Sequence, residues 1–89
     1  MAELSVVKLE GALTLETVAA CLGRALPAGN LVFDFSEVTR VDSSALALLL
    51  AWLRRAKARE STVELRALPE SLCSLARLYG VDALLPIAV

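Results

Sequence analysis

Nine consecutive apolar residues, from Ala45 to Leu53, follow directly on the polar triplet Asp42-Ser43-Ser44. This junction constrains the fold more than any other stretch of the chain. Aspartate and serine oxygens accept hydrogen bonds from the unpaired N–H groups of a first helical turn. Leucine and alanine, which fill most of the apolar run, are strong helix formers. The junction therefore predicts a helix that starts at about Asp42–Ser44, continues to about Arg59, and presents two hydroxyls beside a carboxylate at its N-terminus.

The predicted helix has two stripes of side chains. One stripe consists of leucines and is expected to face a sheet; its members are Leu46, Leu49, Leu50 and Leu53. The other lies well away from the first; its members are Leu48, Trp52, Arg55 and Arg59. Two interpretations of the second stripe stay open. Leu48 and Trp52 either pack against a neighbouring helix or border an exposed docking surface with an arginine rim, because tryptophan and arginine are favoured interface anchors.

The rest of the chain alternates between strand and helix patterns. Strands are expected at residues 4–9, 31–35 and 61–68, with a further short strand at 12–13 across a tight turn at Gly11. Helices are expected at residues 14–26 and 69–79, the second one stopped by Gly80. The apolar side chains that follow the helical period in the first of these are Leu15, Val18, Ala19, Leu22 and Leu26. This order predicts one α/β domain over residues 1–89, with a mixed, mostly parallel sheet of four to five strands and helices packed against it.

Composition and charge narrow the classes of function. The net charge is −1, so the chain carries no electrostatic footprint for nucleic acid. Its longest apolar run is far shorter than the roughly 20 residues that cross a bilayer. The first residues lack the basic and apolar regions of a signal peptide, so we expect a cytoplasmic protein. The hydrophobic fraction of 57% leaves two explanations open, a large core or a partner interface. Cys21 and Cys73 have no metal-type spacing and are expected to be buried free thiols.

Signals of catalysis are absent from the sequence. The four glycines are isolated and form no phosphate cradle. The chain contains no histidine and no plausible cysteine or lysine base beside a serine, so Ser43 has no evident activating partner. Asp34 and Asp42 could be neighbours, but two carboxylates alone are weak grounds for a site. We therefore expect a protein that is not an enzyme and holds no cofactor or metal.

The strand LVFDF followed by SEVTRVDSSALALL resembles the signature of STAS domains, which occur in anti-sigma factor antagonists and in some transporters. Within this family, the closest likeness is to the MlaB-type subunits of ABC transporters that move phospholipids between bacterial membranes. The likeness covers most of the chain. Its specific parts are residues 36–50 and residues 75–86, which read LARLYGVDALLP. The STAS architecture that this resemblance implies agrees with the α/β order of the predicted elements.

The resemblance implies a non-catalytic accessory subunit that binds and stabilises or regulates the MlaF-like ATPase of a phospholipid ABC transporter. Such a subunit contacts the permease only indirectly, serves outer-membrane lipid asymmetry, and lies at the inner membrane through its partner without inserting into it. The residues expected at the interface with the partner are Asp42, Ser43, Ser44, Leu48, Trp52 and Arg55.

An anti-sigma factor antagonist switched by serine phosphorylation is the alternative. In such antagonists, the hydroxyl residue directly after the aspartate is the phosphoacceptor, and that position is Ser43 here. Ala45 stands where a glycine usually follows the two serines, a departure that disfavours close approach of a kinase but not docking. The Arg-Val-Asp lead-in and the Ala-Leu-Ala-Leu-Leu-Leu run favour the transporter hypothesis.

Overall fold

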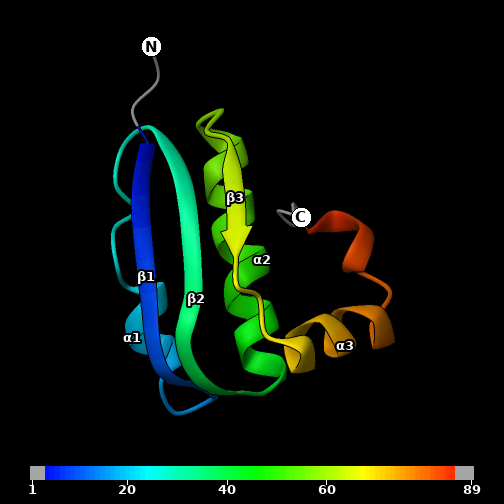
Figure 1. Cartoon of the computed structure of the whole chain (residues 1–89). Helices are drawn as coiled ribbons and strands as arrows, with labels where there is room; N and C mark the ends of the chain where they lie inside the picture. The colour runs from blue at the N-terminus through cyan, green and yellow to red at the C-terminus, as the bar shows by residue number, and fades with distance from the viewer. Residues whose placement is uncertain (1–3, 86–89) are drawn as a thin grey trace.

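Strands and helices alternate along the chain in the computed structural model, which describes residues 4–85 (Figure 1). The elements in order are β1 (Leu4–Leu13), α1 (Val18–Leu22), β2 (Asn30–Val41), α2 (Ser43–Ala58), β3 (Val63–Arg66), α3 (Glu70–Leu78) and the short 3-10 helix η1 (Asp82–Leu84). The predicted α/β class is thus confirmed for the described residues. The expectation that residues 1–89 form one domain reaches beyond that range and stays a prediction.

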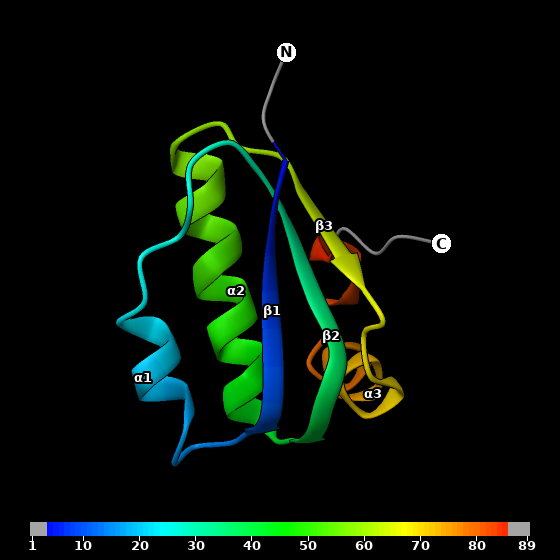
Figure 2. The same ribbon diagram turned by 60° about the vertical axis from the view of Figure 1, so that its left-hand side comes forward.

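The sheet has the strand order β1-β2-β3, and both pairs of neighbours are parallel. Successive right-handed crossovers in one direction place their helices on one side of a sheet. Figure 2 shows α1 and α2 on the same face, and α3 packs against α2 beyond β3. The core therefore lies between the sheet and the helices, while the opposite face of the sheet carries no helix within residues 4–85.

The described strands number three, whereas the sequence predicted a mixed sheet of four to five. The predicted hairpin at Gly11 is wrong, because β1 runs through this glycine, which takes a φ of +71° inside the strand. Strand β2 extends to Val41, beyond the predicted end at Phe35, because it stays paired with β1 over that length. The sheet is consequently parallel throughout the described residues.

The predicted helix at 14–26 is shorter in the structure, where α1 covers only Val18–Leu22. The Thr17 hydroxyl accepts a hydrogen bond from the Thr14 N–H and donates to the Ala12 carbonyl, at 2.9 and 2.8 Å. These bonds hold residues 14–17 in a turn ahead of the helix. Leu15, which was expected on the buried helical face, is therefore 75% exposed.

Helix α2 begins and ends close to the predicted residues. The side of the helix that faces the sheet, however, differs from the predicted leucine stripe. Its fully buried side chains are Ala45, Leu46, Leu48, Leu49, Trp52 and Ala56. Trp52 is 0% exposed and stacks on Phe33 of the central strand, with ring centroids 4.9 Å apart. The interpretation that Leu48 and Trp52 border an exposed docking surface is therefore wrong for the free domain. Their large apolar side chains fill the space over the sheet, and Leu50 and Leu53 are only half-buried.

The two cysteines are free, as predicted, but only half-buried. Helix α3 agrees with the prediction: Leu72 and Ala76 are buried, and Gly80 follows its last turn with a φ of +71°. No helix within residues 4–85 is long and apolar enough to span a membrane.

Candidate recognition site at the N-terminus of α2

The sharp passage from β2 to α2 is organised by Asp42. This residue is the N-cap of α2, and its Oδ1 accepts a hydrogen bond from the Ser44 N–H at 2.8 Å. Its backbone carbonyl accepts from the Ala45 N–H at 3.0 Å, and its own N–H donates to the Leu13 carbonyl at 3.2 Å. Aspartate is suited to this position because its carboxylate satisfies unpaired donors of the first helical turn. The turn is thereby fixed both to the helix and to the end of β1.

The second carboxylate oxygen of Asp42 reaches a different part of the chain. Its Oδ2 accepts a hydrogen bond from the Leu15 N–H at 3.1 Å, which joins the β1–α1 loop to the turn. One carboxylate therefore positions two segments that are 27 residues apart in sequence. As a result, the exposed side chain of Leu15 lies on the same end of the molecule as Ser43. The sequence did not predict Leu15 at this site, because Leu15 fits the apolar spacing of the helix expected at residues 14–26.

The pKa of Asp42 lies below the ordinary value of an aspartate. Partial burial by itself would raise the pKa, because it disfavours the charged carboxylate. The hydrogen bonds from the N–H groups of Leu15, Ser44 and Ala45 stabilise the charged form and outweigh that effect. A lowered pKa in the folded state means that the carboxylate stabilises the fold above its unfolded-state pKa. This contribution is lost as the pH falls through the folded-state value.

Replacing Asp42 with asparagine is therefore expected to destabilise the domain in a pH-dependent way. Asparagine has the same shape and keeps one acceptor oxygen, but it carries no charge. The melting temperatures of the wild type and Asp42→Asn should differ most above about pH 5 and converge as the pH falls below about 4. Thermal melts between neutral and acidic pH measure this difference. A gap that stays constant over the whole range would show that the charge of Asp42 contributes nothing.

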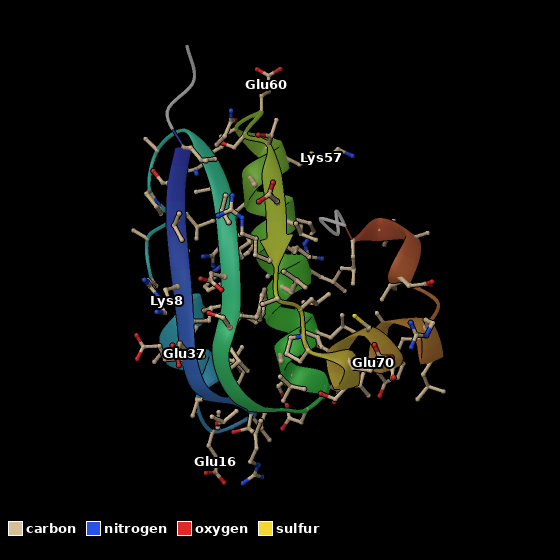
Figure 3. All side chains as sticks on the ribbon, viewed as in Figure 1. Lys8, Glu16, Glu37, Lys57, Glu60 and Glu70 are labelled. Atoms are coloured by element: carbon tan, nitrogen blue, oxygen red, sulfur yellow. The ribbon has the colours of Figure 1, made fainter. Side chains whose placement is uncertain are left out.

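Ser43 is exposed at the first position of α2, and Ser44 is half-buried behind it. Beside them, the β1–α1 loop and the end of β2 enclose a hollow of about 340 Å³. It is lined by Ala12, Thr14, Leu15, Glu16, Thr17, Arg40, Val41 and Asp42. Figure 3 shows Glu16 at this end of the molecule. The structure thus brings three of the predicted site residues, Asp42, Ser43 and Ser44, together with a loop that the sequence did not assign to them.

The remaining predicted site residues do not join this turn. Leu48 and Trp52 belong to the core, as described above. Arg55 lies 12 residues after Ser43 in the same helix, about 18 Å along its axis. The Arg55 guanidinium donates to the Leu22 carbonyl at the end of α1, at 3.0 Å. Arg59 bonds similarly to the carbonyls of Leu26 and Pro27. These hydrogen bonds join the segment between α1 and β2 to α2. The sequence did not predict this structural role of the two arginines.

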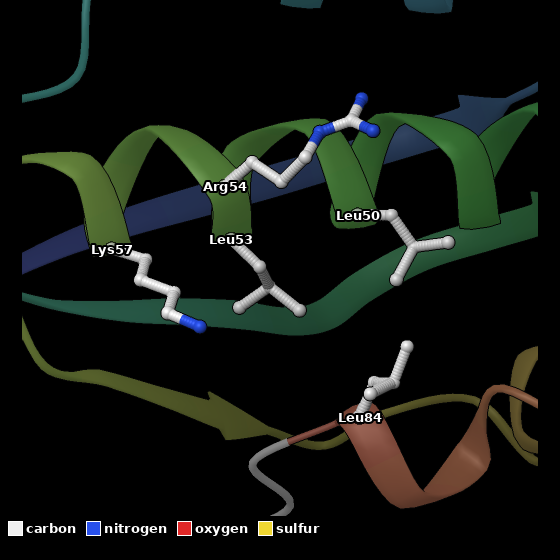
Figure 4. A pocket seen from close by; sticks show the side chains of 5 residues that line it. All are labelled: Leu50, Leu53, Arg54, Lys57 and Leu84. Carbon is white, nitrogen blue, oxygen red and sulfur yellow. The ribbon is translucent and has the colours of Figure 1, made fainter.

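A second hollow lies along the other half of α2. Leu50, Leu53, Arg54, Lys57 and Leu84 line a groove of about 300 Å³ between α2 and η1 (Figure 4). Leu50 and Leu53 occupy its wall because of the rotation of α2, where the sequence predicted that they face the sheet. Since they lie about two to three helical turns from Ser43, the groove is separate from the turn.

The turn carries three kinds of chemical group. It offers an exposed hydroxyl, a large exposed apolar side chain, and a carboxylate that backbone donors already occupy. Within residues 4–85, no cluster of three or more histidine, cysteine, aspartate or glutamate side chains could hold a metal ion. The arrangement is suited to contact with another macromolecule.

Within residues 4–85, a parallel three-stranded sheet has a serine-bearing helix N-terminus after its central strand, and these features define a small α/β domain. The chain belongs to the MlaB-type STAS domain family, since the family model described as "Mlab, STAS domain" matches residues 2–86. The resemblance noted in the sequence is thereby confirmed.

Two curated relatives are similar over part of the chain. They are the "Intermembrane phospholipid transport system binding protein MlaB" of Escherichia coli (strain K12) and the protein of the same name from Shigella flexneri. Each is 38% identical over 55 residues, which is 62% of this chain. The matched region spans 57% of the length of each relative.

Proposed function

We propose that this protein is a non-catalytic accessory subunit that binds the ATPase of an ABC transporter for phospholipids. In this role it stabilises or regulates an MlaF-like ATPase, contacts the permease only through that subunit, and lies in the cytoplasm against the inner membrane. Transport by the complex maintains the lipid asymmetry of the outer membrane. The relatives named as binding proteins of a phospholipid transport system support this proposal.

The observation that carries the proposal is the hydrogen bond from the Leu15 N–H to Asp42, which brings the exposed Leu15 to the end of the molecule where Ser43 is exposed. The backbone under both side chains is joined by hydrogen bonds, since the loop and the helix N-terminus share the same carboxylate. Preorganised surfaces lose little conformational freedom when they bind. A large apolar side chain beside a small hydroxyl also suits a contact with an apolar centre and a polar rim.

Leu15→Glu is expected to weaken binding to the ATPase about tenfold or more, because a charge then replaces an apolar anchor at the centre of the contact. The matched control is Leu78→Glu. Leu15 and Leu78 are both 75% exposed, but Leu78 lies at the end of α3, away from the turn. Co-purification of each variant with a tagged ATPase measures the effect. Equal binding by the two variants would remove Leu15 and the turn surface from the interface.

An anti-sigma factor antagonist is the second candidate, and it rests on the exposed hydroxyl of Ser43. The names of the two relatives favour the transporter role instead. The two candidates differ in their partners, so the same co-purification with a sigma-factor-binding kinase in place of the ATPase distinguishes them. Binding to the kinase and not to the ATPase would favour the anti-sigma factor antagonist over the transporter subunit.

A further inference from the structure

The segment between β1 and β2, residues 14–29, is joined to the rest of the domain through few buried side chains. We call this segment the crossover. Among its residues, all of which the structure describes, Val18 alone is buried, whereas α2, a segment of the same length, buries six residues. Cys21, Leu22 and Leu26 are half-buried and pack against the core from outside. Because stability comes mainly from the burial of apolar area, the crossover is held less firmly than α2.

Side chains along α2 tie the first half of the crossover to this helix. The Leu15 N–H donates to the Oδ2 of Asp42, the N-cap of α2, at 3.1 Å. More than three turns farther along α2, the Arg55 guanidinium donates to the Leu22 carbonyl at 3.0 Å. Both attachments are exposed polar bonds.

Arg59, the C-cap of α2, holds the other end of the crossover. Its guanidinium donates to the carbonyls of Leu26 and Pro27. Because Asp42 and Arg59 cap opposite ends of α2, the attachments are spread over about 25 Å of helix. Figure 2 shows the crossover running beside α2 from the N-terminal end of this helix to its C-terminal end. The crossover is therefore aligned on one helix, chiefly by polar bonds.

Release of the crossover leaves the rest of the fold intact. Strands β1 and β2, which it connects, are paired directly with each other, and α2 packs on the sheet through Trp52 and Phe33. Two bonds to β1, from the hydroxyls of Ser5 and Thr17, are lost on release. Exposed bonds of this kind contribute little, because water competes for the same groups, and the released chain gains conformational freedom. Release therefore costs less free energy than unfolding of the whole domain.

We propose that the crossover detaches from α2 as one unit while the rest of the domain stays folded, and that Arg55 and Arg59 are the positioning residues that hold it attached. In one respect this rests on the proposed function: only the attached form brings Leu15 to the end of the molecule where Ser43 meets the ATPase. Two arginines at the far end of α2 then control the docking surface through the crossover. A bound ATPase favours the attached form, because a ligand that binds one of two states shifts the equilibrium towards it.

Amide hydrogen exchange of the free domain, followed by NMR, measures the opening. Three N–H groups report on the crossover: Leu15 bonds to Asp42, Val18 to the Thr14 carbonyl, and Gly23 to the Ala19 carbonyl. Helix α1 has five residues and does not persist when detached, so all three amides become exposed together. The Leu31 N–H bonds to the Thr62 carbonyl within the sheet and reports on opening of the whole domain instead.

Replacement of the arginines tests whether the crossover opens as a unit. Arg55→Met and Arg59→Met remove the guanidinium donors and keep an unbranched stem. Each should speed the exchange of the three crossover amides by one common factor, about three- to tenfold, which corresponds to about one net hydrogen bond. The sheet amide of Leu31 should keep its rate. Arg55→Lys retains a donor and should have a smaller effect than Arg55→Met.

Arg54→Met is the matched control. Arg54 stands on the same helix, and no hydrogen bond of its side chain is found among residues 4–85. This variant should change none of the four amides. If Arg59→Met left the Leu15 amide unchanged, the two ends of the crossover would move independently, and the proposal would be wrong. Equal acceleration at Leu31 would overturn it too, because the whole domain would then open.

The complex with the ATPase tests the link to docking. With the ATPase at ten times its Kd, the three crossover amides should exchange about tenfold more slowly than in the free domain. Unchanged exchange in a complex that does form would overturn this link. A domain that binds no ATPase would contradict the proposed function, while the exchange of the free variants would still decide whether the crossover moves as a unit.

Discussion

Trp52→Ala is expected to lower the free energy of unfolding by about 3–5 kcal/mol. Trp52 is 0% exposed, stacks on Phe33, and belongs to the cluster that joins α2 to the sheet. Alanine would leave a cavity that the surrounding residues fill only in part, and the lost contacts add to the lost burial. Urea unfolding measures the effect as a shift of the midpoint, with the slope checked for a change in the denatured state.

Two control variants separate packing from polarity in this prediction. Trp52→Phe keeps an aromatic ring on Phe33 and removes the indole N–H, which is buried and has no hydrogen-bond partner among the described residues. It should therefore cost much less than alanine. Leu53→Ala, one position along and half-buried, should shift the midpoint less than Trp52→Ala does. If Trp52→Ala left the midpoint near that of Leu53→Ala and abolished binding to the ATPase, its assignment to the core would be wrong.

Ser43→Glu is expected to abolish docking to the ATPase while the domain stays as stable as the wild type. Asp42, and not Ser43, caps α2, and no hydrogen bond of the Ser43 side chain is found among residues 4–85. A carboxylate in the first turn is even favoured by the helix dipole, by roughly 0.3–1 kcal/mol. At an interface shaped for a hydroxyl, however, the new charge is desolvated without a partner. That costs several kcal/mol, enough to erase a micromolar interaction.

Ser43→Gln is the matched control, because glutamine has nearly the size of glutamate but no charge. It should bind more weakly than the wild type and better than Ser43→Glu. Co-purification with the ATPase measures binding, and a thermal melt of each free domain measures stability. Full binding by Ser43→Glu would place Ser43 outside the interface. A collapsed melt would instead mean that the turn serves the fold alone.

The Asp42–Ala58 segment was predictable because its signals are local. A capping carboxylate and two serines stand directly before a leucine-rich run, so the start of α2 follows from sequence. The choice of Asp42-Ser43-Ser44 as a candidate site came instead from the resemblance to STAS domains, because capping signals alone indicate only the start of a helix. The alternation of strands and helices likewise predicted the α/β class.

Which side of α2 faces the sheet was decided by tertiary structure. Both stripes of the helix are apolar over Leu46–Leu53, and periodicity alone does not say which of two apolar stripes is buried. Burial of the largest ring, Trp52 on Phe33, turned the helix and moved Leu50 and Leu53 to the groove. The number of strands was also undecided, because Gly11 suits both a tight turn and a strand that continues through it.

The chain by itself determined the elements whose causes lie within a few neighbouring residues: the capped start of α2, the stop of α3 at Gly80, and the serine-bearing turn. Tertiary structure alone decided which residues accompany that turn. Leu15 joins it through a hydrogen bond to Asp42 that spans 27 residues. Arg55 lies about 18 Å from the turn along α2, and its guanidinium bonds to the Leu22 carbonyl, 33 residues distant. Hydrogen bonds of this kind form only where the folded backbone brings a donor close to an acceptor. When the two are far apart in the sequence, no local pattern encodes their proximity.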